Sequence, residues 1–118
     1  MDTKNKELLL KDLNARLPYG VKIEITWWVM DEGTCINTTL EPDHIEQLLN
    51  DEDGDTEIKP YLFPMSSMTE KEEYYQLQQR VVNEDVTKHI NYCYKKHLDI
   101  NNLIPIGLAI DATNLNIY

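Results

Sequence analysis

A stripe of leucines near the start of the chain gives the first pattern. Within residues 5–17 these leucines recur at the spacing of one face of an amphipathic helix: Leu9, Leu10, Leu13 and Leu17. Pro18 pushes the residue before it away from helical dihedrals, and Gly20 permits a tight turn. The pattern predicts a helix over residues 5–17 that ends at this turn.

Strict alternation follows and predicts a strand from Val21 to Met30. One face carries Val21, Ile23, Ile25, Trp27 and Val29, and the other carries Lys22, Glu24, Thr26, Trp28 and Met30. Asp31-Glu32-Gly33 supplies turn chemistry, and residues 34–40 are rich enough in β-branched side chains to return as an antiparallel partner. We therefore expect a hairpin.

Residues 41–57 contain eight carboxylates and no Lys or Arg. Pro42 is placed to open a short helix, whose apolar residues are Ile45, Leu48 and Leu49. The run NDEDGD that follows reads as a solvated loop. Residues 56–62 look extended, but Pro60 cannot donate to a central ladder and indicates an edge strand or a strand end.

The second half of the chain reads as helical. Ser67 and Glu70 have the spacing of a capping box and predict a helix start. We expect two helices, over residues 68–82 and 84–97, with a kink between them, or one long helix. The final residues show too little pattern to assign and are expected to form a short C-terminal tail. The fold class is then α+β, as one domain over residues 1–118, with an N-terminal helix and a small antiparallel sheet of three to four strands.

Composition agrees with a globular domain and excludes several function classes. Neither a signal peptide nor a transmembrane span is expected, and two cysteines without CxxC spacing suit reduced thiols, so we expect a cytoplasmic protein without membrane contact. Eleven Lys and Arg face 21 Asp and Glu, for a formal net charge of -10. This sign disfavours direct nucleic-acid binding, but it either attracts a basic partner or keeps the protein soluble.

We expect neither a metal site nor a cofactor. Asp51, Asp53 and Asp55 resemble a calcium ligand ladder, but with Gly54 at the invariant glycine of an EF-hand loop the first and last positions become Leu49 and Pro60. His89, Cys93 and His97 invite a zinc interpretation, yet the outer two are separated by about 12 Å along a helix, too far to hold one ion.

Catalytic motifs are missing from the sequence. The candidate nucleophiles are Ser66, Ser67, Cys35 and Cys93, and the candidate bases are His44, His89 and His97. The chain has no GxSxG elbow, P-loop or GxGxxG motif, and Ser67 is already explained as a helix cap. We expect no enzymatic activity, and keep a small hydrolase as an alternative.

Aromatic residues point to binding instead. Trp27 and Trp28 must point to opposite faces of a strand, so a sheet covered on one side leaves one of them exposed unless the N-terminal helix or the C-terminal tail covers it. Indoles are frequent among interface hot spots. Trp28, Met30 and Tyr74 are therefore the candidate interface, on a protein expected to be a monomer or weak homodimer.

A dense segment, IKPYLFPMSSMTE, has a structural interpretation. Pro60 ends a strand, and Tyr61, Leu62, Phe63 and Met65 offer core contacts, while Ser67 and Glu70 cap a helix. We call this segment the structural joint and assign to it five residues: Pro60, Tyr61, Pro64, Ser67 and Glu70.

Two runs, KDLNARLPYGVK at residues 11–22 and IKPYLFPMSSMTEKE at residues 58–72, resemble the signature of a known family. It comprises small uncharacterised proteins of anaerobic gut bacteria and of their phages or prophage-like elements. Residues 103–109 and the closing Tyr118 also resemble that family, whose members often carry arginine where Phe63 stands. The resemblance implies a phage or mobile-element context and transfers no catalytic residue.

Together these features predict a non-catalytic accessory protein of phage or mobile-element origin that acts by binding another, unknown protein. The alternative is an acidic mimic of nucleic acid that inhibits a host nuclease or DNA-binding protein, through carboxylates of residues 41–57 and of the long helix. Mimicry normally needs acids over a continuous face, whereas here they concentrate in one loop.

Overall fold

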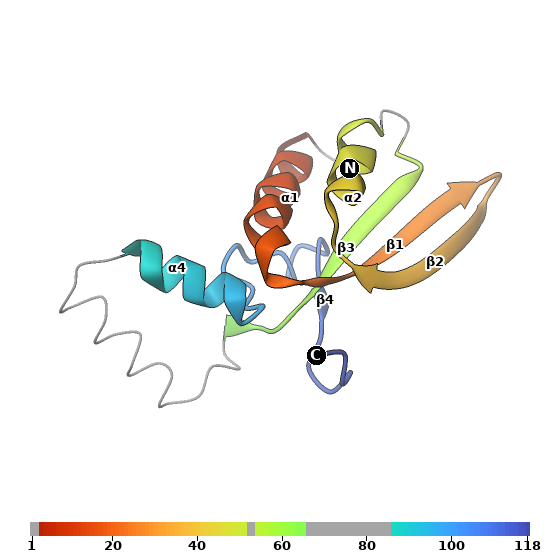
Figure 1. Ribbon diagram of the computed structural model, residues 1–118. Coiled ribbons are helices and arrows are strands. Elements are labelled where there is room, and N and C mark those ends of the chain that lie inside the picture. The colour runs from red at the N-terminus through yellow and green to blue at the C-terminus, as the bar shows by residue number, and fades with distance from the viewer. Residues whose placement is uncertain (1–2, 52–53, 66–85) are drawn as a thin grey trace.

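The computed structural model describes residues 3–51, 54–65 and 86–118, in an α+β arrangement as the sequence predicts (Figure 1). Its elements, in chain order, are α1 (Thr3–Arg16), η1 (Leu17–Tyr19), β1 (Lys22–Val29), β2 (Glu32–Thr39), α2 (Pro42–Leu49), β3 (Thr56–Leu62), α4 (Val86–Lys95) and β4 (Ile110–Asp111). The predicted helix over residues 68–82, with Ser67, Glu70 and Tyr74, lies outside the described residues. None of the described helices is long and apolar enough to cross a membrane.

The four strands form one mixed sheet in the order β2-β1-β3-β4. β1 runs antiparallel to β2 and β3, as expected, but β4 runs parallel to β3, so the prediction of a purely antiparallel sheet was wrong. The added strand pairs only at Tyr61 with Ile110 and at Leu62 with Asp111. A strand of two residues is too short to show a periodic pattern. Parallel strands are joined by long connections, so the local sequence around β4 did not indicate its pairing with β3.

The hairpin turn lies at Met30 and Asp31, not at Asp31-Glu32-Gly33 as predicted. Val29 pairs with Glu32, which leaves a two-residue loop whose φ angles are 50° and 67°. Positive φ at both central residues is the feature of the type I′ turn, whose twist matches that of the flanking strands. Gly33 is thereby released from the turn and becomes part of β2.

Hydrogen bonds of β1 alternate between its two neighbours. The Leu40 amide, just beyond β2, donates to the Val21 carbonyl at 2.9 Å, and on the other side the Trp28 amide donates to the Asp55 carbonyl at 2.9 Å. In an antiparallel ladder the bonded pairs recur at every second residue. Odd-numbered residues of β1 therefore bond towards β2, and even-numbered residues bond towards β3.

This alternation explains how Pro60 fits inside a strand. Pro60 pairs with Ile23, an odd-numbered residue of β1, so the pair is one that exchanges no hydrogen bonds. The proline nitrogen faces away from β1, and pairing with β4 begins only at Tyr61. Pro60 therefore costs the β1–β3 ladder no hydrogen bond, and the prediction that it marks an edge strand or ends a strand was wrong, because β3 is an inner strand that continues to Leu62.

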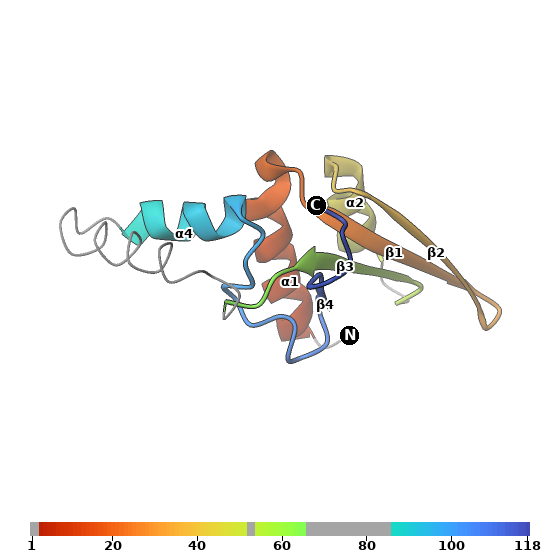
Figure 2. The ribbon, with the colours of Figure 1, turned by 90° about the horizontal axis from the view of Figure 1, so that it is seen from below.

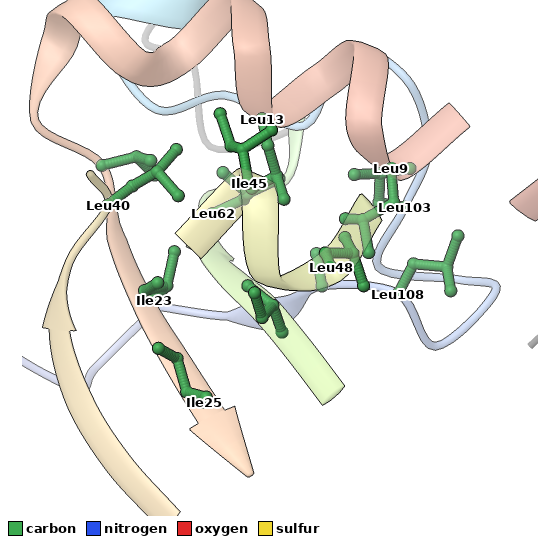
Figure 3. Close-up of a cluster of buried hydrophobic side chains, with 13 residues drawn as sticks. Leu9, Leu13, Ile23, Ile25, Leu40, Ile45, Leu48, Leu62, Leu103 and Leu108 are labelled. Carbon is green, nitrogen blue, oxygen red and sulfur yellow. The ribbon is translucent and has the colours of Figure 1, made fainter. Parts of the chain in front are cut away.

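The core fills the space between one face of the sheet and the helices α1 and α2 (Figures 2 and 3). The strand residues predicted to face it, Val21, Ile23 and Ile25, are fully buried there. Burial of each such side chain contributes about 1.5–3 kcal/mol. The remaining members of the cluster come from both helices, the end of the hairpin just beyond β2, β3 and the C-terminal segment: Leu9, Leu13, Leu40, Ile45, Leu48, Ile58, Leu62, Leu103, Leu108 and Ala109.

The segment after α4 takes part in the fold. Leu103 and Leu108 lie in the core, and the carboxylate of Asp99 accepts hydrogen bonds from the Leu103 amide at 2.7 Å and the Ile104 amide at 2.9 Å. A buried carboxylate that accepts two amides fixes a turn. These contacts order residues that the sequence left unassigned and that we expected to form a tail.

The opposite face of the sheet is covered by two tyrosines. The Tyr61 hydroxyl donates to Oδ1 of Asn37 at 2.7 Å, across all three antiparallel strands. The Tyr118 hydroxyl donates to the Tyr61 carbonyl at 2.7 Å and accepts from the Lys22 amide at 2.7 Å. Tyr61 is thus buried, but its contacts lie on the face away from the helices. This burial agrees with the core contact predicted for Tyr61, but alternation along β3 gives the helix-covered face to its neighbours Pro60 and Leu62.

Candidate interaction surface

Negative charge is concentrated in one part of the chain. Residues 23–58 contain 11 Asp and Glu and no Lys or Arg, so the rest of the chain has 10 acidic and 11 basic residues. We call residues 23–58 the acidic half; it runs from β1 through β2 and α2 into β3. The whole net charge of the protein therefore arises in these elements, over a wider area than the single acidic loop that the sequence suggested.

Many of these carboxylates are exposed. Asp31 and Glu32 lie at the hairpin turn, and Asp43 and Glu46 lie on α2. Other carboxylates of the acidic half have structural partners, among them Glu24, whose Oε2 accepts a hydrogen bond from the Tyr61 hydroxyl at 3.3 Å. Asp51 accepts hydrogen bonds from the Asp55 and Thr56 amides at 3.1 Å each, Glu57 forms an ion pair with Lys59, and Glu41 caps α2. The surface is therefore rich in acids that are not needed to hold the fold.

Apolar side chains are exposed at the end of the hairpin. Met30 is 94% exposed, Val29 is 68% exposed and Trp28 is 45% exposed. Both ribbon views show the hairpin extending beyond the two helices, on the side of the molecule away from α4 (Figures 1 and 2). Val29 lies on the same face of β1 as Val21, Ile23 and Ile25, as the alternation predicts. Val29 is nevertheless exposed, because α1 and α2 do not extend over this end of the strand (Figure 1).

The two tryptophans point to opposite faces, as predicted, and differ in exposure. Trp27 is half-buried against the core, whereas Trp28 lies on the other face, opposite Gly33 of β2. A β-carbon at position 33 would come within 2.9 Å of Cζ3 of the Trp28 indole. We considered that the N-terminal helix or the C-terminal tail covers this indole. Trp28 is exposed, so neither of them buries it. Tyr74, the third candidate interface residue, lies outside the described residues.

β2 forms the outer edge of the sheet. Its first six residues are exposed, and its register with β1 runs through eight consecutive pairs without a bulge. Among the residues that the structure describes, no strand pairs with its outer side. Ile36, 43% exposed, adds an apolar side chain to this strand on the face that carries Val29. Sequence reasoning missed Ile36, although it is the one large apolar residue between Met30 and Leu40.

A second unusual feature is a buried ion pair within α1, which also contacts the C-terminal segment. Asp12 and Arg16 are both fully buried, and Nε of Arg16 donates to Oδ1 of Asp12 at 2.5 Å. Arg16 also donates to the Leu98 carbonyl at 2.6 Å, and its guanidinium carbon lies 4.9 Å from the centre of the Tyr94 ring. The sequence pattern offered a signal for this pair, because both residues lie on the helix face of Leu9 and Leu13.

His97 and Tyr118 extend this cluster. Their rings stack with centroids 4.0 Å apart. Burial, reinforced by the positive charge of Arg16, lowers the pKa of His97 to about 4, and burial raises the pKa of Tyr118 to about 12. Both groups are therefore neutral at physiological pH. Among the residues that the structure describes, Nη1 of Arg16 and Nδ1 of His97 are buried and find no hydrogen-bond partner. The cluster ties α1, the end of α4 and the last residue together.

The candidate catalytic residues are not assembled into a site among the described residues. Cys93 is buried, and this burial raises the pKa of its thiol, which keeps it protonated and poorly nucleophilic. Cys35 is exposed, and its Sγ lies 3.1 Å from Oγ1 of Thr26. Nδ1 of His44 accepts a hydrogen bond from the Glu41 amide as part of a helix cap. Ser66 and Ser67 lie outside the described residues.

Metal ligands do not cluster in the described part of the chain either. No group of three or more His, Cys, Asp or Glu residues there is arranged to hold an ion. Asp51 and Asp55 of the acidic loop are described, and Asp51 binds backbone amides. The hairpin end, the β2 edge and the surrounding carboxylates are therefore the strongest candidate surface.

Comparisons of the chain with protein-family models, with curated proteins and with solved structures found no match.

Proposed function

We propose that this protein is a non-catalytic interaction module that binds a basic protein partner through its acidic half. The observation that carries the proposal is the segregation of charge: 11 acidic and no basic residues in residues 23–58, against a nearly balanced remainder. A surface of one sign attracts partners of the opposite sign and repels others, so it raises the association rate and gives specificity. A net charge kept only for solubility has no reason to be confined to residues 23–58, less than a third of the chain.

The exposed hairpin residues supply the second element of a binding site. Affinity at interfaces comes from a few buried aromatic and apolar anchors, surrounded by polar residues that exclude water. Trp28, Val29 and Met30 have this character, with Asp31 and Glu32 beside them. Bound to a basic surface, the apolar residues would be buried at the centre and the carboxylates would pair at the rim.

The cellular context rests on the family resemblance. We propose a cytoplasmic accessory protein of phage or mobile-element origin whose partner is a host or phage protein. Helix α4 lies at the end of the molecule opposite the hairpin (Figure 1), so we assign it no part in this binding.

The charge distribution also favours a second candidate function, mimicry of nucleic acid. Acids spread over the hairpin, α2 and the acidic loop form a broader negative surface than the loop alone. Such a surface competes with DNA or RNA for a basic groove. The two functions differ in one measurement, because a mimic is displaced from its partner by nucleic acid and an ordinary interaction module is not.

The proposal is tested by quantitative capture of proteins from a lysate of the bacterial host. Immobilised wild type is compared with a variant carrying Asp31→Asn, Glu32→Gln, Asp43→Asn and Glu46→Gln, four exposed acids of the acidic half. The matched control neutralises four acids outside it, by Glu7→Gln, Glu72→Gln, Glu73→Gln and Glu84→Gln. We expect basic proteins to be captured by wild type and control and lost by the variant. Equal capture by all three proteins would contradict the proposal, and so would capture of no basic protein.

A further inference from the structure

We infer that the free edge of β2 accepts an extended basic segment of the partner as a fifth strand of the sheet. The inference deepens the proposed function and rests on it for the positive charge of the partner. It identifies the part of the partner that is recognised, which is a length of backbone in extended form with basic side chains. Addition of a strand to an open sheet edge is a common mode of peptide recognition, in which backbone hydrogen bonds supply affinity.

The alternation of hydrogen bonds shows which groups are free to bind. Residues of β2 opposite odd-numbered residues of β1 bond inward, as the Leu40 amide does to the Val21 carbonyl. The residues between them direct both their amide and their carbonyl outward, away from β1. These outward-facing residues are Gly33, Cys35, Asn37 and Thr39.

In its own sequence and pairing, the β2 edge lacks the usual protection against strand addition. Natural edge strands are protected by proline, by lysine, by a bulge or by their shortness. β2 has none of these over its eight residues, and Glu32 at its end is its single charged residue. Half of the strand is β-branched, which favours extended pairing: Thr34, Ile36, Thr38 and Thr39. The strand is thus suited to pairing on its outer side.

Charge selects the occupant of this edge. A second copy of the chain would bring two acidic halves together, each with 11 acidic and no basic residues, and the like charges would repel. A basic segment would instead be attracted by the carboxylates of the acidic half. Its alternate side chains would lie over the two faces of the sheet, where Glu24 lies on the face of Trp28 and Glu32 lies on the face of Ile36. The expected segment therefore alternates Lys or Arg with apolar or β-branched residues.

The test uses two synthetic peptides with blocked ends. The first alternates lysine and valine over ten residues, and the second has the same sequence with N-methyl groups on every backbone nitrogen, so that neither edge of the peptide can donate. The two peptides carry equal charge, but the second cannot complete a ladder. Binding to the wild-type protein is measured by calorimetry at low and at physiological salt, and light scattering reports the oligomeric state.

A substitution in the protein gives a second, independent test. Cys35→Pro removes one outward-facing amide without removing any hydrogen bond to β1, and Cys35→Ala is the matched control that keeps the amide. We expect both N-methylation of the peptide and Cys35→Pro to weaken binding by at least about tenfold, and Cys35→Ala to leave it unchanged. Circular dichroism confirms that each variant is folded.

Three results would overturn the inference. Equal binding of both peptides would show attraction by charge alone, which contradicts strand addition and leaves the proposed function standing. Binding of neither peptide would contradict both. A stable dimer of the protein alone, abolished by Cys35→Pro, would show that a second copy occupies the edge.

Discussion

The indole of Trp28 covers Gly33 on the neighbouring strand, so closely that a β-carbon at position 33 would lie 2.9 Å from Cζ3 of the ring. The glycine gives the ring a surface against which to lie, and the ring in turn covers backbone that has no side chain of its own. The indole is still 45% exposed in this position. An exposed aromatic side chain that is already held in place loses less entropy when it becomes an interface anchor.

Replacement of Gly33 by alanine should displace the Trp28 ring. The new methyl group requires the indole to move, and because the contact is with the far end of a side chain, the cost in stability should be below about 1 kcal/mol. The indole N–H resonances of the two tryptophans report the change by NMR. We expect the Trp28 resonance to shift and the Trp27 resonance to remain. A spectrum identical to that of wild type would show that the ring does not depend on this glycine.

The ion pair inside the protein predicts a large effect of Asp12→Asn. The substitution leaves the guanidinium of Arg16 buried without its counter-charge, which should reduce the free energy of unfolding by about 3–5 kcal/mol. Chemical denaturation measures the loss. The double variant Asp12→Leu with Arg16→Met removes both charges and should be less destabilised than the single variant. A double variant at least as unstable as Asp12→Asn would contradict this explanation.

His97 predicts that stability falls on mild acidification. Its pKa is lowered to about 4 in the fold, against 6.5 for the free side chain, so the unfolded chain binds a proton that the folded chain does not. The stabilisation is complete above pH 6.5 and is lost as the pH falls towards 4. We expect a loss of about 1–2 kcal/mol, since partial exposure of the ring weakens the effect. Unfolding measured at pH 7 and pH 5 should show a smaller difference in His97→Asn than in wild type. An equal difference in both proteins would assign it to other groups.

The two cysteines should differ in reactivity. Cys35 is exposed on β2, whereas Cys93 is buried and burial raises the pKa of its thiol. A thiol reagent should therefore label one cysteine in the native protein and both in denaturant. Mass spectrometry identifies the labelled position, with Cys35→Ala as the control that should stay unlabelled in the native state. Rapid native labelling of Cys93 would contradict its burial.

The sequence allowed the local elements to be predicted and missed the long-range ones. The leucine stripe and the alternation of residues 21–30 are strong periodic signals, and both predicted elements agree with α1 and β1 to within a few residues. β4 is two residues long and pairs with a strand some fifty residues away, so no local pattern indicated it. We predicted the turn one residue too late, because glycine is common in turns and Gly33 therefore indicated a turn at residues 31–33. In the structure Met30 and Asp31 adopt the left-handed conformation despite their side chains.

The candidate surface was predictable in part. Adjacent tryptophans on a strand singled out Trp28, and its neighbour Met30 is the most exposed of the large apolar side chains in the described chain. Exposure of Val29 and of the β2 edge depends on where the covering helices end, which is a tertiary property. The same holds for Arg16, whose burial requires the Leu98 carbonyl and the Tyr94 ring from the other end of the chain.

Binding by the acidic half is tested most directly by an NMR titration of the isotope-labelled protein with the alternating lysine and valine peptide. We expect shift changes to be confined to the acidic half and to be largest at the amides of Gly33, Cys35, Asn37 and Thr39, which face outward from β2. Resonances of α4 and of residues 98–118 should not move. Shift changes centred on those C-terminal residues, or no shifts at all at low salt, would contradict the claim that the acidic half binds a basic partner.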